Sequence, residues 1–366
     1  LLDALIDPVI GRGCDRLFAY SLRAVLLSGA GAAVLLAIGF GLLFFPPTLT
    51  PDALLVWAGV LLVFTYAAYS ALSVAHQSWG AMLGGDEPYR SRVVAWREGL
   101  GLLGVVLASI TPVLLGLPVT LAVFCVALAL GWVAWCGALR PQTAGKHASA
   151  DIWHPFSRPA FRRLLLVFVL NGIASAVPAT LVLFFVQDRL QAPKAIESAV
   201  LAVYFLCAAL SIPAWLAVVA RLGLARSWLL GMLLAVAAFV WATQLGAGDT
   251  PAFLLVCALS GLALGTDLAL PGAMLAGVIA DAGDRGRSEG AYFGWWNFAT
   301  KLNLALAAGL ALPLLGLFGY APGVRDAAAL QALTIAYCLL PCLLKLAAGS
   351  ALYVLFIRPS PRTATP

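Results

Sequence analysis

Carboxylate side chains with a spacing that could bind a cation occur near the start of this chain. Asp3 and Asp7 are four residues apart in LLDALIDPVIG, so a helix would present both carboxylates on one face. Two such groups can ligate Na⁺ or Li⁺, or share a proton. The alternative is a structural cap or ion pair near the helix end. The spacing therefore predicts a cation or proton site at Asp3 and Asp7.

Further charged residues lie deep inside apolar segments. Asp267 is several residues inside LGTDLALPGAML, and Lys301 lies in the apolar segment that begins at Glu289. Because a charge facing lipid is costly, we expect Asp267 to face a cavity or a partner such as Lys301. Lys301 could bind substrate hydroxyls, replace a cation or pair with an aspartate. Lys345 could lie toward the interior or extend to the membrane interface.

A polar and aromatic stripe follows the segment TYAAYSALSVAHQSWG. Aromatic faces can stack on a pyranose ring while neighbouring amide or imidazole groups hydrogen-bond its hydroxyls. Ordinary packing is the alternative. The stripe predicts a sugar-binding surface, and its residues are Tyr66, Tyr69, Ser73, His76, Gln77 and Trp79.

Three other residues are candidates for the same binding cavity. Arg97, next to Glu98, begins an apolar span after an expected loop at DEPYRSRVVAW. A guanidinium there could bind hydroxyls in a bidentate manner or anchor the helix end. Asn171 and Trp295 lie in later apolar segments and are expected to line the cavity.

Charged turns at helix ends are candidates for gates. GRGCDR contains Gly11, Asp15 and Arg16, and we expect a turn there. DAGDRGR contains Asp281, Asp284 and Arg285 and is expected to be a short loop between two membrane helices. Ordinary charged turns are the alternative. Both segments predict ion pairs between helix ends.

Composition defines the class of protein that must position these residues. Of 366 residues, 63% are hydrophobic and only 10% are charged, whereas soluble proteins are nearer half apolar and a quarter charged. The apolar runs extend over about 20 residues, the length of a transmembrane helix, and not the roughly 10-residue alternating segments of a barrel. We therefore predict an all-α, polytopic membrane protein.

The remaining bulk features exclude several partners. The net charge of +6 comes from basic residues in short connections, which is not a nucleic-acid-binding pattern. The seven cysteines fall mostly in apolar runs without metal-ligand spacing, and we interpret them as buried packing residues. No cofactor or metal is expected apart from a coupling ion.

The apolar runs predict an opening half-helix followed by ten spans. Their approximate ranges are 22–45, 53–79, 95–116, 117–139, 163–187, 197–220, 227–246, 252–280, 290–319 and 331–357. Because the chain opens inside a helical pattern, we expect the first helix and part of the second to be missing from a twelve-helix protein. The predicted parts are a truncated N-terminal half at 1–139, a cytoplasmic linker at 140–162, a C-terminal six-helix half at 163–357 and a cytoplasmic tail at 358–366.

Basic residues gather in alternate connections. They occur at 12–23, 90–97, 140–163, 221–226, 285–287 and 358–362, whereas the other connections carry only Arg189, Lys194 and Arg325. The positive-inside rule assigns the first set to the cytoplasm. We therefore expect a multi-pass protein of the bacterial inner membrane with a cytoplasmic C-terminus.

Taken together, several segments resemble the glycoside–pentoside–hexuronide:cation symporters of the major facilitator superfamily, the melibiose-permease type. The resemblance covers the whole chain. It rests on DALIDPVIG with the following GxxxDR, on RSRVVAWR, and on ALPGAMLAGVIAD, SEGAYFGWWNFATKL and GLFGY.

The resemblance implies a twelve-helix fold with a midplane sugar site and alternating access. In that family the pair matching Asp3 and Asp7 carries the coupling cation, and residues matching Arg97 and Lys301 line or flank the substrate cavity. Ser73 stands where relatives have a polar or acidic residue of the cation and sugar sites. Because Ser73 is not a carboxylate, it would ligate Na⁺ weakly, which favours H⁺ coupling or exchange.

The sequence thus predicts a secondary active transporter and not an enzyme. We expect a monomer, in contact with membrane lipid, that performs Na⁺- or H⁺-coupled symport of a sugar, glycoside or related polar solute. A lysolipid carrier with the same fold is the first alternative. A prenyltransferase-like membrane enzyme is more remote, since it would need Asp3/Asp7 and Asp281/Asp284 as two magnesium–pyrophosphate motifs, and the second pair lies in an arginine-bearing loop.

Overall fold

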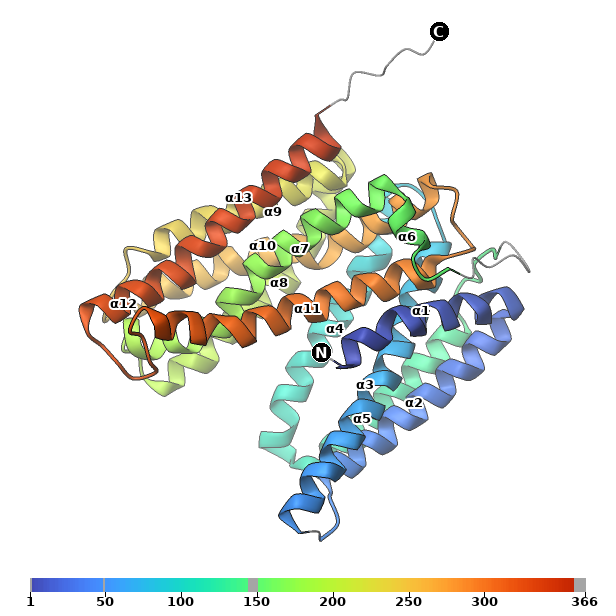
Figure 1. Ribbon diagram of the computed structural model, residues 1–366, viewed down its shortest axis with the longest axis horizontal. Helices are drawn as coiled ribbons and strands as arrows, with labels where there is room; N and C mark the ends of the chain where they lie inside the picture. The colour runs from blue at the N-terminus through green and yellow to red at the C-terminus, as the bar shows by residue number, and fades with distance from the viewer. Residues whose placement is uncertain (1, 49, 144–150, 359–366) are drawn as a thin grey trace. The chain divides into compact units, whose positions relative to one another are not determined.

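The chain is helical throughout the part that the structure describes, which is residues 2–48, 50–143 and 151–358 of this computed structural model (Figure 1). Ten helical segments in that part are long and apolar enough to cross a membrane. The predicted all-helical, multi-span membrane fold is therefore confirmed. The side chain of Asp3 and residues 359–366 of the tail predicted at 358–366 lie outside the described residues.

Contacts divide the chain into two compact units. The first comprises residues 1–85, 100–159 and 276–299, and the second comprises 86–99, 160–275 and 300–366. Four helices contribute residues to both units, namely α4 (Glu87–Leu115), α10 (Thr250–Asp281), α11 (Glu289–Leu317) and, through Pro159 alone, α7 (Pro159–Phe184). This division describes packing, and the linear halves at 1–139 and 163–357 stay a prediction.

The first unit is built on α1 (Leu2–Tyr20), α2 (Leu22–Phe44) and α3 (Pro51–Met82), which pack against one another, with α5 (Leu117–Cys136) against α2. Ser21 separates α1 from α2, because its extended backbone ends one helix while its hydroxyl accepts the N–H of Ala24 at 3.0 Å. The short helix α6 (His154–Ser157) belongs to the same unit.

The second unit contains the C-terminal helices. Its elements are α7 (Pro159–Phe184), η1 (Phe185–Arg189), α8 (Lys194–Leu222), α9 (Leu224–Ala242), α12 (Ala327–Thr334), η2 (Ile335–Leu339), α13 (Leu340–Leu352) and η3 (Tyr353–Ile357), where η marks a π-helical turn. α9 and α13 run side by side (Figure 1). The buried core includes a stack of Phe185 on Tyr337, with ring centroids 4.3 Å apart.

A glycine and a carboxylate together form the tight junction between α8 and α9. Gly223 has φ of 79°, which a residue with a Cβ atom adopts at a cost, so the chain reverses without a longer loop. Glu87, at the start of α4, accepts the N–H of Leu224 at 2.9 Å. The carboxylate thus satisfies one of the free donors at the beginning of α9.

Two predicted connections are helical. The turn expected at Gly11–Arg16 is wrong, because α1 continues to Tyr20. The segment DEPYRSRVVAW, expected to be a loop before Arg97, instead lies almost wholly in α4, which begins at Glu87. Asp86 accepts the N–H of Tyr89 at 2.9 Å, and Pro88 suits a first helical turn, so this helix starts earlier than its apolar run.

Candidate functional site

A buried polar network in the second unit is centred on Asp267 of α10. Its Oδ1 accepts hydrogen bonds from Asn171 Nδ2 and Trp228 Nε1, each at 2.9 Å. Its Oδ2 accepts from Ser175 Oγ at 3.1 Å and from Lys345 Nζ at 2.8 Å. Four donors, one of them cationic, stabilise the ionised carboxylate.

Lys345 of α13 is the cation of this network. Its side chain is 4% exposed and that of Asp267 is 12% exposed. Lys345 Nζ also donates to Asn171 Oδ1 at 2.8 Å, so the amide of Asn171 bridges the two charged groups. Asn171 and Ser175 are four residues apart on α7 and therefore lie on one helix face. Side chains from α7, α9, α10 and α13 thus converge on one ion pair.

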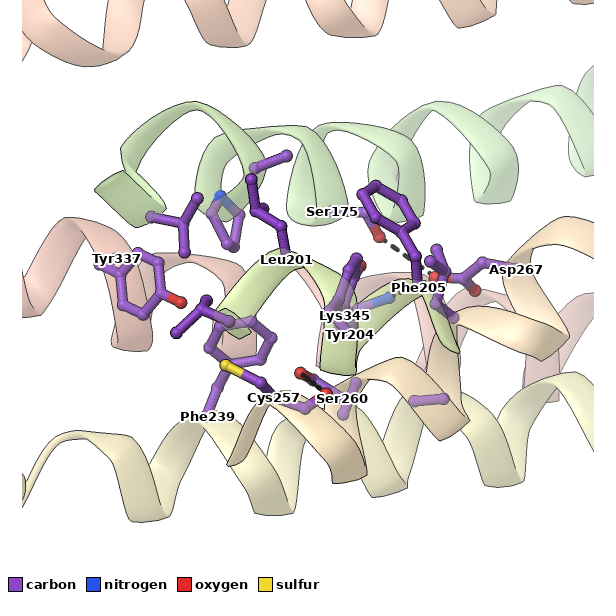
Figure 2. A pocket seen from close by; sticks show the side chains of 17 residues that line it. Ser175, Leu201, Tyr204, Phe205, Phe239, Cys257, Ser260, Asp267, Tyr337 and Lys345 are labelled. Atoms are coloured by element: carbon purple, nitrogen blue, oxygen red, sulfur yellow. Dashed lines mark hydrogen bonds and ion pairs between the residues drawn. The ribbon is translucent and has the colours of Figure 1, made fainter. Parts of the chain in front are cut away.

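The network adjoins a cavity of about 140 Å³. Figure 2 shows Asp267 and Ser175 at one end of the lining and Tyr337 and Phe239 toward the other. The walls come mainly from apolar and aromatic residues of α7, α8, α9 and α10. Such a cavity, apolar with a few convergent polar groups, has the character of a small-molecule site.

The predicted residues Asn171 and Asp267 are thus brought together in one site. The cation that pairs with Asp267 is Lys345, and Ser175 and Trp228 complete its hydrogen bonding. Lys345, Ser175 and Trp228 were not among the predicted binding residues. The sequence did contain one indication of this site. Lys345 is a lone lysine inside an apolar span, and a lysine in such a position requires a buried partner.

The stripe on α3 does not form one continuous buried surface. Tyr66 and Tyr69 are 48% and 53% exposed, and His76 is also exposed. Gln77 is half-buried, and its Nε2 donates to Ser73 Oγ at 2.9 Å. The sugar-binding role of these residues stays a prediction.

Two other predicted cavity residues have local partners. Arg97 forms an ion pair with its neighbour Glu98, with Nη2 and Oε1 2.7 Å apart. Trp295 Nε1 donates to the carbonyl of Ile152 at 2.8 Å, and its ring lies 4.8 Å from that of Trp153. Trp295 therefore holds the residues just before α6. Lys301 is half-buried.

In the first unit, α1 makes a close contact with the beginning of α11. Asp15 is buried, and its carboxylate accepts the N–H groups of Gly290 at 2.6 Å and Ala291 at 2.9 Å. A Cβ atom at Gly11 would meet the carbonyl of Gly290. Asp15 thus caps the N-terminus of α11, where donors are free and the helix dipole favours an anion.

A second cluster surrounds Asp284, between α10 and α11. Arg158 donates to its two carboxylate oxygens at 3.0 and 2.9 Å, Tyr292 Oη donates at 2.7 Å, and His154 Nε2 lies 3.1 Å away. The cluster joins the segment 151–158 to the α10–α11 turn. Of the other predicted gating residues, Gly11 is buried whereas Arg16, Asp281 and Arg285 are exposed.

A family model described as MFS/sugar transport protein matches residues 1–358. The chain belongs to this family. It is thus a secondary transporter of the major facilitator superfamily, a multi-pass membrane protein that binds a small-molecule solute, and not an enzyme. No curated protein matches it.

Several solved structures share the fold of this MFS transporter. A bacterial homologue of the iron transporter ferroportin has a TM-score of 0.69 at 16% identity, covering 96% of this chain and 87% of that one. The E. coli fucose:proton symporter FucP has a TM-score of 0.62 at 13% identity, covering 94% of this chain and 91% of that one. The human organic anion transporter MFSD10 has a TM-score of 0.62 at 18% identity, covering 96% of this chain and 81% of that one. These identities support a common fold and do not identify a solute.

In this MFS transporter, the Asp284 cluster gives a prediction of pH dependence. Burial alone would raise the pKa of Asp284, but hydrogen bonds from Arg158, Tyr292 and His154 hold the pKa below its usual range. Because the pKa is lower in the folded state, the ionised Asp284 stabilises the fold at pH values above the ordinary aspartate pKa of about 3.9. This stabilisation is lost as the pH falls through the folded-state pKa. We expect amide exchange in residues 151–158 to stay slow at neutral pH and to accelerate below about pH 4.

The measurement is hydrogen exchange followed by mass spectrometry, normalised for the intrinsic pH dependence of exchange. Asp284→Asn should make exchange of this segment faster already at neutral pH and remove most of its further pH dependence. Asp281→Asn is the matched control, because Asp281 is an exposed aspartate at the end of α10, three residues before Asp284. Equal exchange in wild type and Asp284→Asn would contradict the assignment.

Proposed function

We propose that this transporter couples the movement of a sugar, glycoside or related polar solute to a Na⁺ or H⁺ gradient, as a melibiose-permease-type member of its family. Asp3, Asp7 and Ser73 would hold the coupling ion, and Arg97 and Lys301 would flank the solute. We further propose a monomer in the bacterial inner membrane with its C-terminus in the cytoplasm.

Asp7 is the observation that carries this proposal. Its side chain is 0% exposed, although it lies on a helix of a membrane transporter. A buried carboxylate needs a proton, a cation or a basic group close by to offset the loss of hydration. The charge state of Asp7 therefore depends on whether such a proton, cation or basic group is bound or close by. A carboxylate that couples transport to an ion must have this dependence.

Two further observations are compatible with coupling through this region. Ser73 Oγ accepts a hydrogen bond from Gln77, which leaves oxygen lone-pair capacity for a cation or solute. A fucose:proton symporter is among the proteins with the same fold. The fold therefore accommodates proton-coupled sugar transport, and we propose the same class of activity here.

The solute side of the proposal uses the Asp267 network. Its ion pair is held in place by Asn171, Ser175 and Trp228, so its geometry is fixed before a solute arrives. A preorganised site loses little entropy when a ligand binds. A solute hydroxyl or other oxygen could then bind Lys345 without rearrangement.

Uptake into proteoliposomes tests the proposal. The purified protein is presented with labelled sugars and glycosides under inward Na⁺, Li⁺ or H⁺ gradients. We expect accumulation that depends on one gradient and disappears when an ionophore removes it. Accumulation of no sugar or glycoside under any gradient would overturn the proposal.

A lysolipid carrier is the second candidate, and one observation favours it. An apolar groove of about 660 Å³ is lined by residues of α7, α11 and the α12–α13 region in the second unit, with Gln331 as its polar residue. An acyl chain suits such a surface. Uptake of a labelled lysolipid, with polar solutes inactive and Gln77→Ala without effect, would favour this candidate over the first.

A further inference from the structure

The cavity beside Asp267 has polar groups at separate places and apolar walls between them. Near the ion pair are Lys345 and Ser175, whereas Tyr337 lies toward the other end (Figure 2). The rest of the lining is mostly apolar, for example Ala179, Phe239 and Ala263, and its other polar atoms belong to Tyr204, Cys257 and Ser260. This arrangement limits which solutes the cavity can accept.

Lys345 can donate one more hydrogen bond. An ammonium group has three N–H donors, and the described residues account for two, through Asp267 Oδ2 and Asn171 Oδ1. Lys345 also lines the cavity. A solute oxygen placed there would satisfy the third donor.

Tyr337 supplies a second polar contact. The residue is 3% exposed, its ring stacks on Phe185, and it lines the cavity. Its hydroxyl makes no hydrogen bond to any residue that the structure describes. Figure 2 shows this hydroxyl directed toward the other lining residues. A cavity-lining hydroxyl that the described residues leave unpaired can hydrogen-bond to a ligand.

The size and the walls of the cavity favour an apolar ring over a free sugar as the occupant. A cavity of about 140 Å³ is close to one that holds a single benzene ring, roughly 150 Å³. A free hexose carries hydroxyls on all sides, and most would face alkyl or aromatic groups here. Each hydroxyl buried without a partner opposes binding. An apolar ring with one or two oxygen atoms fits both the volume and the lining.

The charge of the network favours a neutral occupant. Asp267 already compensates the Lys345 ammonium, with 2.8 Å between Nζ and Oδ2. An anionic ligand would add an uncompensated negative charge to this buried pair and lose its own hydration. A hydroxyl, ether or carbonyl oxygen accepts from Lys345 without that cost.

We infer that this cavity binds a neutral, amphipathic group: one ring-sized apolar body with a hydroxyl, ether or carbonyl oxygen hydrogen-bonded to Lys345. The inference rests on the proposed function and narrows its solute class. Among glycosides, the cavity takes an apolar aglycone in preference to an unsubstituted sugar. The saccharide of such a solute lies outside the cavity.

Equilibrium binding tests this inference without any ion gradient. The protein in nanodiscs is titrated with 4-fluorobenzyl alcohol and with 4-fluorobenzoate, and binding is followed by ¹⁹F NMR. We expect the alcohol to bind at least about tenfold more tightly than the benzoate. Ala179→Leu adds apolar atoms to the cavity wall and should weaken binding of the alcohol by about tenfold or more.

Controls separate cavity binding from partition into lipid. Ala202→Leu makes the same change at an exposed position of α8 that does not line the cavity. This variant should bind the alcohol as tightly as wild type. Ala263→Val makes a smaller addition to the part of the cavity wall formed by α10 and should also weaken binding. Equal alcohol binding in wild type, Ala179→Leu and Ala263→Val would overturn the inference, as would tighter binding of benzoate. Gradient-driven sugar uptake without alcohol binding would overturn the inference while retaining the proposed function.

Discussion

Replacing Lys345 by methionine should lower the free energy of unfolding by about 3–5 kcal/mol, because it leaves the buried Asp267 carboxylate without its cation. The two side chains are 4% and 12% exposed, so water does little to compensate the remaining charge. Methionine has a similar length and keeps the apolar contacts of the lysine stem. Equilibrium unfolding in mixed detergent micelles measures the change.

The neutral double variant distinguishes a charge effect from a packing effect. Asp267→Asn combined with Lys345→Met removes both charges, and replacing a whole buried ion pair is often close to neutral for stability. We therefore expect the double variant to regain more than half of the stability that Lys345→Met loses. Transport should remain impaired in both, since neither retains the ammonium that faces the cavity.

Lys194→Met is the matched control for these measurements. Lys194 is exposed at the start of α8, so its replacement should change stability by less than about 0.5 kcal/mol. A loss of stability in Lys345→Met no larger than in Lys194→Met would contradict the role of the ion pair. So would a double variant as unstable as the sum of the two single variants.

The spans were predictable because membrane crossing imposes a length and an apolar composition on each helix. Ten predicted spans correspond to the ten long apolar helices of the described chain. The start of α4 at Glu87 was missed because the helix extends through the polar segment YRSR, before its apolar run begins. The start is marked by the capping residue Asp86 and not by hydrophobicity. Hydropathy reports the apolar part of a helix and not its polar end.

The error at GRGCDR has a different cause. Glycine lowers helix propensity by about 1 kcal/mol, so Gly11 and Gly13 favoured a turn. In the structure, Gly11 lies where a Cβ atom would meet Gly290, and Asp15 binds the first amides of α11. The glycine serves close packing between segments far apart in sequence. No local pattern contains that information.

The candidate site was partly predictable for a related reason. The cost of a charge in an apolar span correctly indicated that Asp267 needs a partner. Which lysine provides it depends on the relative rotation and depth of α10, α11 and α13, and one sequence does not encode these quantities in any readable spacing. From the sequence, Lys345 and Lys301 were therefore both candidates for the partner of Asp267. The structure pairs Asp267 with Lys345.

Asp7→Asn should abolish gradient-driven accumulation, with a fall of at least about tenfold, equivalent to roughly 1.4 kcal/mol or more. Asparagine has nearly the shape of aspartate but cannot take up a proton or carry the charge that holds a cation. Because Asp7 is 0% exposed, bulk water does not substitute for the lost carboxylate charge. Solute exchange without a gradient should continue, since it needs no net ion movement.

The comparison of accumulation with exchange is what tests coupling. A variant that fails to fold loses both activities, whereas an uncoupled variant loses only accumulation. Asp52→Asn is the control, because Asp52 is an exposed aspartate in the first turn of α3 and should retain both. Undiminished accumulation in Asp7→Asn would exclude Asp7 as the coupling carboxylate. Proton or cation binding would then have to lie elsewhere, and the buried Asp267–Lys345 pair would be the next group to test.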